Sequence, residues 1–167
     1  RVCALEMARL KALRESEKRL RGDLLSALMQ ETLSPNDARL WLENLSYDPD
    51  LPYLAVRFAW EGANPPSRRR LETLVNGELA RLGLNGVASP LGAEMICFLP
   101  APASGRPEQE IAFCQSVQNQ GAKEQPRHAV RCGIGAPARE LGTWRTSFRQ
   151  AGQALELARR LGESRPL

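Results

Sequence analysis

Few side chains in this sequence have the chemistry and spacing of a catalytic or metal-binding site. The chain has 167 residues and a single histidine, His128, which precedes an apolar segment. A Ser/His/Asp or Cys/His arrangement would have to use this residue, and we expect it to be structural instead. The four cysteines stand far apart: Cys3, Cys97, Cys114 and Cys132. Because a zinc site needs closely spaced Cys and His ligands, we expect free thiols in a reducing compartment, buried at the last three positions.

Motifs that cradle phosphate or present a nucleophile are also missing from the sequence. It contains neither a Gly-x-Ser-x-Gly elbow nor a Gly-x-x-x-x-Gly-Lys loop. The run 133–135 (Gly-Ile-Gly) is too short for a dinucleotide fingerprint, and we expect its glycines to let a strand turn beneath a helix. No apolar run approaches the roughly 18 residues of a membrane span, and the first residues show no secretory signal. We therefore expect a cytoplasmic domain without membrane contact, metal or cofactor.

One run of basic residues, Arg68, Arg69 and Arg70, could contact a phosphate or a partner. The net charge is +4 and the sequence pI is about 9.2, but the other basic residues are scattered. The run lies at the start of a predicted helix, where each cation opposes the helix dipole by roughly a few tenths of a kcal/mol. Two interpretations stay open: a solvated first helical turn, or a contact surface, which would include direct binding of DNA.

The last third of the chain shows how these residues are held. Residues 129–135 are typical of a short strand ending at the glycines, and a long amphipathic helix follows Pro137. Its apolar stripe has helical spacing: Trp144, Phe148, Ala151, Leu155 and Ala158. A strand, a glycine corner and a helix with small buried residues indicate a helix lying flat on a sheet. Ser147 is then a small residue at the helix–sheet contact.

Two helices are predicted before the sheet begins. Residues 2–30 are rich in good helix formers and place Leu10, Leu13, Leu20, Leu24 and Ala27 on an imperfect heptad seam. The seam indicates either a contact between two chains or packing on the helix's own domain. Ser34 and Pro35 then start a short helix to about residue 45, burying Leu40, Trp41 and Leu45. It lacks the basic face of a DNA-reading helix, so we do not expect a helix-turn-helix here.

The remaining pattern completes an α+β fold. Strands are predicted at residues 53–60, 87–89, 94–99 and 129–135, and helices at 68–82 and from 107 to about 118, with a loose polar segment at 121–125. After the two N-terminal helices, the order is βαββαβα, which is the ferredoxin-like plan with an antiparallel sheet. The sequence leaves open whether the sheet has an additional edge strand.

These segments resemble the GGDEF-like domain of PucR/CdaR-type bacterial transcription regulators, most clearly over the last thirty residues. Arg21, Asp23, Leu24, Leu25 and Leu28 are similar to an R-x-L-L-x-x-L segment of that family. The resemblance implies a linker or signalling helix over residues 1–33 and a regulatory domain over 34–167, cut from a longer protein. It implies a homodimer that relays a signal from an upstream sensor to a helix-turn-helix beyond residue 167. DNA would then be bound only through that missing domain.

The resemblance also implies that the domain is not an enzyme. Active GGDEF domains place glycines and a metal-binding acid in the turn of the central hairpin, and a second acid on the first strand. Here the hairpin residues are Leu91, Gly92, Ala93 and Glu94, so the metal-binding acid is an alanine. The first strand, residues 55–60, offers an arginine (Arg57) or an alanine where aspartate is needed, with Glu61 at its exit. We expect Glu94 to face solvent. The alternative is a sensor that still binds a nucleotide or metabolite in the vestigial cleft.

Overall fold

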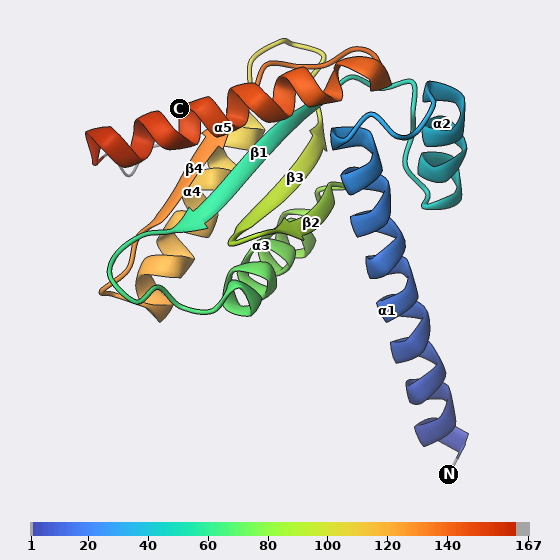
Figure 1. The fold of residues 1–167 in the computed structure, drawn as a ribbon. Helices are drawn as coiled ribbons and strands as arrows, with labels where there is room; N and C mark the ends of the chain where they lie inside the picture. Colours follow the sequence, from blue (N-terminus) through green and yellow to red (C-terminus); the bar gives the residue numbers. More distant parts are fainter. Residues whose placement is uncertain (1, 163–167) are drawn as a thin grey trace.

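The computed structural model describes residues 2–162, and its elements follow the predicted order (Figure 1). They are α1 (Val2–Met29), α2 (Pro35–Asn44), β1 (Tyr53–Trp60), α3 (Arg68–Leu82), β2 (Val87–Leu91), β3 (Glu94–Pro100), α4 (Glu108–Glu124), β4 (Val130–Ile134), the short 3-10 helix η1 (Leu141–Thr143) and α5 (Trp144–Leu161). Among these residues no helix is apolar over a length that could cross a membrane.

The four described strands form one antiparallel sheet in the order β2-β3-β1-β4. Central β1 pairs with β3 on one side and β4 on the other, as the ferredoxin-like plan requires. The predicted fold class is therefore confirmed, and no additional edge strand is present within residues 2–162.

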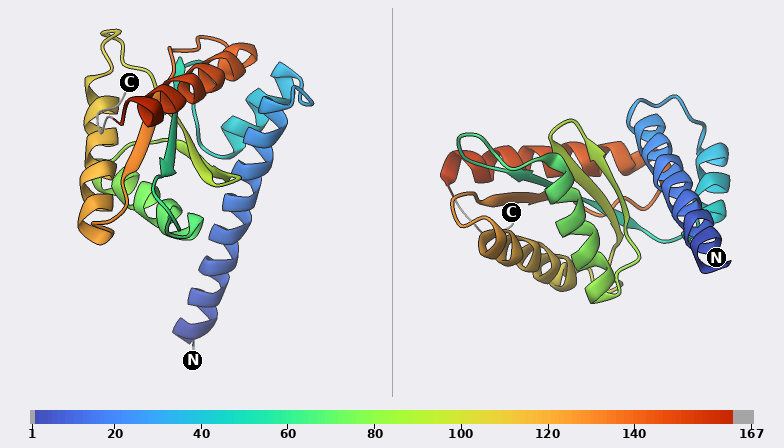
Figure 2. Two further views of the ribbon diagram at one scale, coloured as in Figure 1. Left: turned by 60° about the vertical axis from the view of Figure 1, so that its left-hand side comes forward. Right: turned by 90° about the horizontal axis from the view of Figure 1, so that it is seen from below.

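Successive side chains of β1 point to opposite faces of the sheet, so the core is divided into two layers. Leu54, Val56, Phe58 and Trp60 face α3 and α4, in a cluster with Phe113 and Val117 among others. The opposite face of the sheet meets α5, α2 and the end of α1, where Trp144 stacks on Phe98 with ring centroids 4.4 Å apart. Figure 2 shows the sheet between α5 on one side and α3 and α4 on the other.

Two local expectations about helices are corrected by the structure. Leu40 is 57% exposed, because α2 turns Ala38 and Leu42 inward instead. The predicted loose segment 121–125 is wrong, since α4 continues to Glu124. Gly121 is buried in this last part of the helix, and a Cβ there would stand 2.6 Å from the Val130 side chain. The glycine thus marks a close helix–sheet contact and not a loop.

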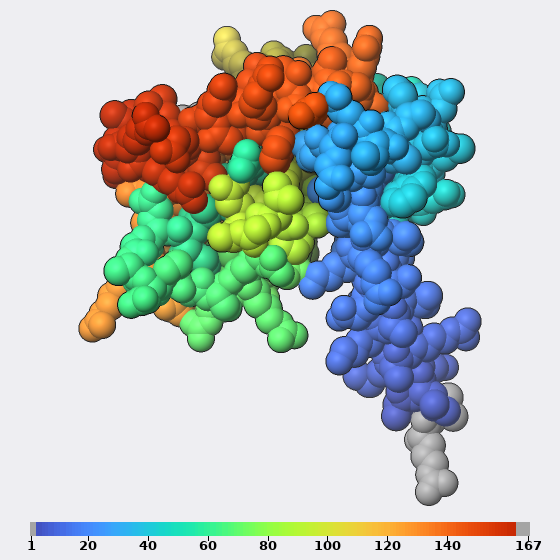
Figure 3. All heavy atoms as spheres, viewed as in Figure 1, coloured from blue at the N-terminus to red at the C-terminus, as the bar shows by residue number. Residues whose placement is uncertain are grey.

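The long helix α1 behaves differently along its length. Its N-terminal half stands clear of the rest of the molecule (Figure 3). Near its end, Leu24, Leu25 and Leu28 are buried in the same cluster as Ala38 and Leu42 of α2. The end of the helix thus packs on its own domain, whereas a contact between two chains through the exposed leucines stays a prediction.

Candidate functional site

The hairpin between β2 and β3 turns through Gly92 and Ala93. Gly92 adopts a φ of 57°, which glycine reaches without steric cost. Arg68, in the first turn of α3, donates a hydrogen bond from Nη1 to the Gly92 carbonyl oxygen at 2.9 Å. The structure thus joins two features that lie 24 residues apart in the sequence, the basic run and the hairpin. Arg69 and Arg70 remain exposed on α3.

Glu94, at the start of β3, does not face solvent as expected. Its Oε2 lies 2.6 Å from Nη2 and 2.8 Å from Nε of Arg57 on β1, and both side chains are less than one-fifth exposed. The expectation failed because it judged Glu94 from its place at the start of a strand. The antiparallel register sets it beside an arginine on the neighbouring strand, and an ion pair results.

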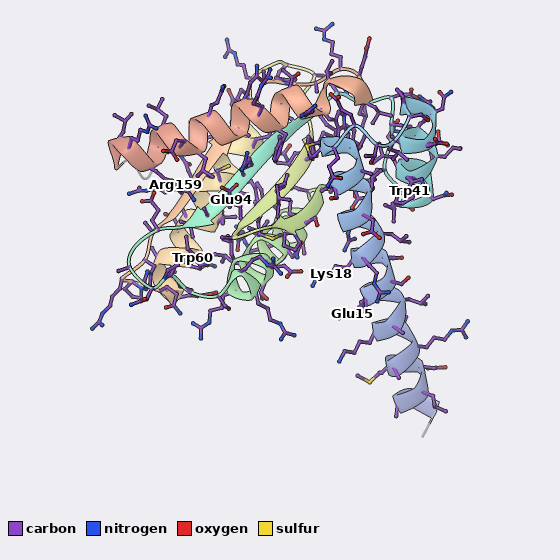
Figure 4. All side chains as sticks on the ribbon, viewed as in Figure 1. Glu15, Lys18, Trp41, Trp60, Glu94 and Arg159 are labelled. Atoms are coloured by element: carbon purple, nitrogen blue, oxygen red, sulfur yellow. The ribbon has the colours of Figure 1, made fainter. Side chains whose placement is uncertain are left out.

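The other acid near this end of β1, Glu61, is also paired with arginines. Its Oε2 accepts a hydrogen bond from Nε of Arg131 on β4 at 2.9 Å. Arg159, on α5, lies 3.8 Å from a carboxylate oxygen of Glu61 and 3.8 Å from one of Glu94. Figure 4 shows Arg159 and Glu94 close together beneath α5. A guanidinium group therefore lies between the two carboxylates.

This arrangement does not fit a magnesium ion. Mg²⁺ requires oxygen ligands in near-octahedral geometry, and the nearby carboxylates already face guanidinium groups. Ala93 has no side-chain oxygen to add, and the positive charge of Arg57 and Arg159 opposes a divalent cation. The sequence did carry a signal for this cluster, because each of two apolar strands contains an arginine, Arg57 and Arg131. A charged residue in an apolar strand needs an acidic partner, and few acids lie near these strands in the sequence.

Further candidate residues have structural contacts. The Nδ1 atom of His128 is 3.1 Å from the Glu61 carbonyl oxygen. Cys97, Cys114 and Cys132 are buried free thiols, and burial raises the pKa of Cys97 and of Cys114 well above the ordinary value. Cys3 is exposed on α1. None of the three buried thiols is therefore placed to act as a nucleophile.

Ser147 has a more specific contact than a small packing residue would need. It is 1% exposed, and its Oγ accepts a hydrogen bond from the Ala55 amide at 2.9 Å. The Ala55 carbonyl accepts a bond from the Gly135 amide, just beyond the last ladder pair of β1 and β4. The hydroxyl of Ser147 thus accepts a hydrogen bond from a β1 amide at the point where pairing with β4 ends.

On α1, the seam residues divide into two groups. Leu10 and Leu13 are each 53% exposed and Leu20 is 44% exposed, whereas Leu24 is fully buried in its own chain. Leu24 is therefore not available to a second chain. Lys18 forms an ion pair with Glu72 of α3, which ties the middle of α1 to the domain.

The strand order and the β2–β3 hairpin place this protein in the class of ferredoxin-like α+β domains. The sequence profile of the GGDEF-like domain matches residues 30–157, and the chain belongs to this family. A comparison with curated protein sequences gave no significant match.

Among solved structures, the chain is similar to the regulator of polyketide synthase expression from Bifidobacterium adolescentis. The TM-score is 0.56 at 11% sequence identity, over 84% of this chain and 51% of the other. The chain thus spans about half the length of that regulator. At this identity the similarity concerns the fold.

Proposed function

We propose that this GGDEF-like domain is a non-catalytic regulatory and dimerisation domain of a PucR/CdaR-type bacterial transcription regulator. The observation that carries the proposal is the pairing of Glu94 with Arg57, beside a hairpin turn in which Ala93 stands where the family resemblance implies a metal-binding acid. Nucleotidyl transfer on this scaffold depends on Mg²⁺ to neutralise the triphosphate, and these residues offer it no suitable ligands. The domain would act in the cytoplasm through contacts with other protein segments.

The proposed role in regulation draws support from two further features. One solved structure with a similar fold is a regulator of polyketide synthase expression, of which this chain spans about half. In addition, α1 is a rod of about 40 Å, at 1.5 Å per residue, that projects from the domain with exposed leucines. Such a helix can relay a rotation or displacement from an upstream sensor toward a downstream helix-turn-helix.

Cysteine crosslinking on α1 tests the dimerisation part of this proposal. Leu13→Cys and Leu20→Cys are introduced separately in a Cys3→Ser background, because Cys3 is itself exposed. At 100° per residue, Glu15 lies on the opposite side of the helix from both, so Glu15→Cys is the matched control. We expect mild oxidation to trap a disulfide dimer at positions 13 and 20 and far less at 15. No dimer at either seam position, or equal yields at all three, would contradict the proposal.

A turnover assay tests the non-catalytic part. The chain is incubated with GTP or ATP and Mg²⁺ or Mn²⁺, and pyrophosphate release and cyclic products are measured. We expect no turnover above a sample without protein. Metal-dependent product formation that is lost in the Glu94→Gln variant would overturn the proposal.

A further inference from the structure

A groove runs along α5 on the side that meets the start of β3, on the face seen in Figure 3. Its volume is about 700 Å³, within the usual range for small-molecule sites. Arginines outnumber acids in its lining, five against two. The arginines are Arg57, Arg145, Arg149, Arg159 and Arg160, and the acids are Glu94 and Glu156. Arg145 also pairs with Glu31, and Arg159 lies near Glu61, so these five guanidinium groups face four carboxylates and the groove keeps a small surplus of positive charge.

The floor of the groove is built around Arg57. Its guanidinium carbon lies 4.4 Å from the centre of the Phe148 ring, while Glu94 holds its nitrogens from the β3 side. A Cβ on Gly152 would stand only 2.2 Å from Nη1 of Arg57, so the absence of a side chain on α5 makes room for this group. Arg57 is thus fixed at the base of the groove.

The rim of the groove has guanidinium groups with donors to spare. The side chain of Arg149 forms no ion pair or hydrogen bond with any residue in the range 2–162. Arg160 pairs with Glu156 at 3.1 Å and keeps 75% of its side chain exposed. The two positions lie 11 residues apart, or about 16 Å along the helix axis. Planar guanidinium groups match phosphate oxygens with paired hydrogen bonds, and they need no metal to do so.

We propose that this groove binds a small molecule bearing adjacent phosphate groups, without magnesium. The arginines of α5 and Arg57 would neutralise the charge that Mg²⁺ neutralises in an active cyclase. The biological meaning of this inference rests on the proposed regulatory role, since a ligand here would touch α5, β1 and β3 at once. The binding itself can be measured independently of that role.

Isothermal titration of the chain with pyrophosphate, ATP and GTP in the presence of EDTA tests the proposal, with citrate as an anion that lacks phosphate. The Arg149→Ala/Arg160→Ala variant removes two rim charges. The Arg69→Ala/Arg70→Ala variant removes the same charge from α3 and is the matched control. We expect at least one phosphate ligand to bind the wild type more tightly than citrate. Its affinity should fall at least about tenfold in the groove variant and stay unchanged in the control.

The titrations are repeated with Mg²⁺ in place of EDTA. Several results would overturn the inference: no binding of any phosphate probe, binding that occurs only with Mg²⁺, citrate binding as tightly as the best phosphate probe, or equal losses in both double variants. Sedimentation velocity on the same samples reports the oligomeric state. Failure of the titration with a retained dimer would refute the groove alone and leave the proposed dimerisation standing. A monomer that still binds phosphate would refute the dimerisation and leave the groove standing.

Discussion

Ser147 joins α5 to the sheet through one buried hydrogen bond, from the Ala55 amide to its Oγ at 2.9 Å. Ser147→Ala would leave that amide without a partner in a buried position. We expect the free energy of unfolding to fall by about 1–3 kcal/mol, the usual cost of an unsatisfied buried donor. Urea denaturation measures the change, and Thr146→Ala on the exposed side of the same turn is the control. Equal stability of Ser147→Ala and the wild type would show that the hydroxyl serves packing only.

Glu110 makes stability depend on pH. It is 3% exposed, and its Oε2 has no hydrogen-bond partner among the described residues. Burial raises its pKa above the ordinary value of 4.5, although its own backbone amide offsets part of the effect. The folded state therefore holds this proton more strongly than the unfolded state. Below about pH 4.5 the Glu110 carboxyl costs the folded state no stability, because it is largely protonated in both states. As the pH rises through the raised pKa, the free energy of unfolding falls.

Glu110→Gln should remove this loss. We expect the variant to be more stable than the wild type at pH 7.5, with the difference shrinking toward pH 4, as measured by urea denaturation across that range. Glu108→Gln, an exposed change in the same helical turn, controls for the loss of a negative charge near the start of α4. A difference that does not vary with pH would mean that Glu110 keeps its charge by some other contact.

At the scale of elements, the contact between β4 and α5 depends on a glycine. A Cβ on Gly133 would lie 2.2 Å from the Ala151 carbonyl oxygen and 2.3 Å from the Leu155 amide nitrogen. These are backbone atoms, so the helix itself would have to move. We expect Gly133→Ala to destabilise the fold by about 1–3 kcal/mol or more. Thermal unfolding measures this, and Gly142→Ala, where an added Cβ meets nothing within 4 Å, is the control.

The elements were largely predictable because their patterns are local. The predicted strand 53–60 and helix 68–82 match β1 and α3 at both ends. What the sequence could not supply was the register between strands, which sets Arg57 beside Glu94. The groove was missed for the same reason: Gly152 and Arg57 lie far apart in sequence and meet only when α5 crosses the sheet. The prediction at Gly121 was wrong because glycine is typical both of loops and of places where a helix lies close against a sheet.

At the scale of the whole molecule, the two ends of α1 have different surroundings. Its last turns fill the core with Leu24, Leu25 and Leu28, whereas Leu10 and Leu13 stay more than half exposed. The hydrophobic cluster of the domain therefore extends before residue 34, where the predicted regulatory domain starts. It follows that folding and pairing should be separable by shortening this one helix.

Two shortened chains test that separation. A chain that begins at residue 20 keeps the three buried leucines and loses only the projecting part of α1, together with the ion pair of Lys18 and Glu72. We expect its free energy of unfolding to lie within about 1 kcal/mol of the full chain, and we expect it to sediment as a monomer. A chain that begins at residue 31 loses all three leucines. Since truncating one buried leucine costs about 2–5 kcal/mol, this second chain should fail to fold cooperatively.

If the first chain is also unfolded, the projecting half of α1 stabilises the domain. If it is folded and still dimeric, the pairing surface lies elsewhere on the molecule.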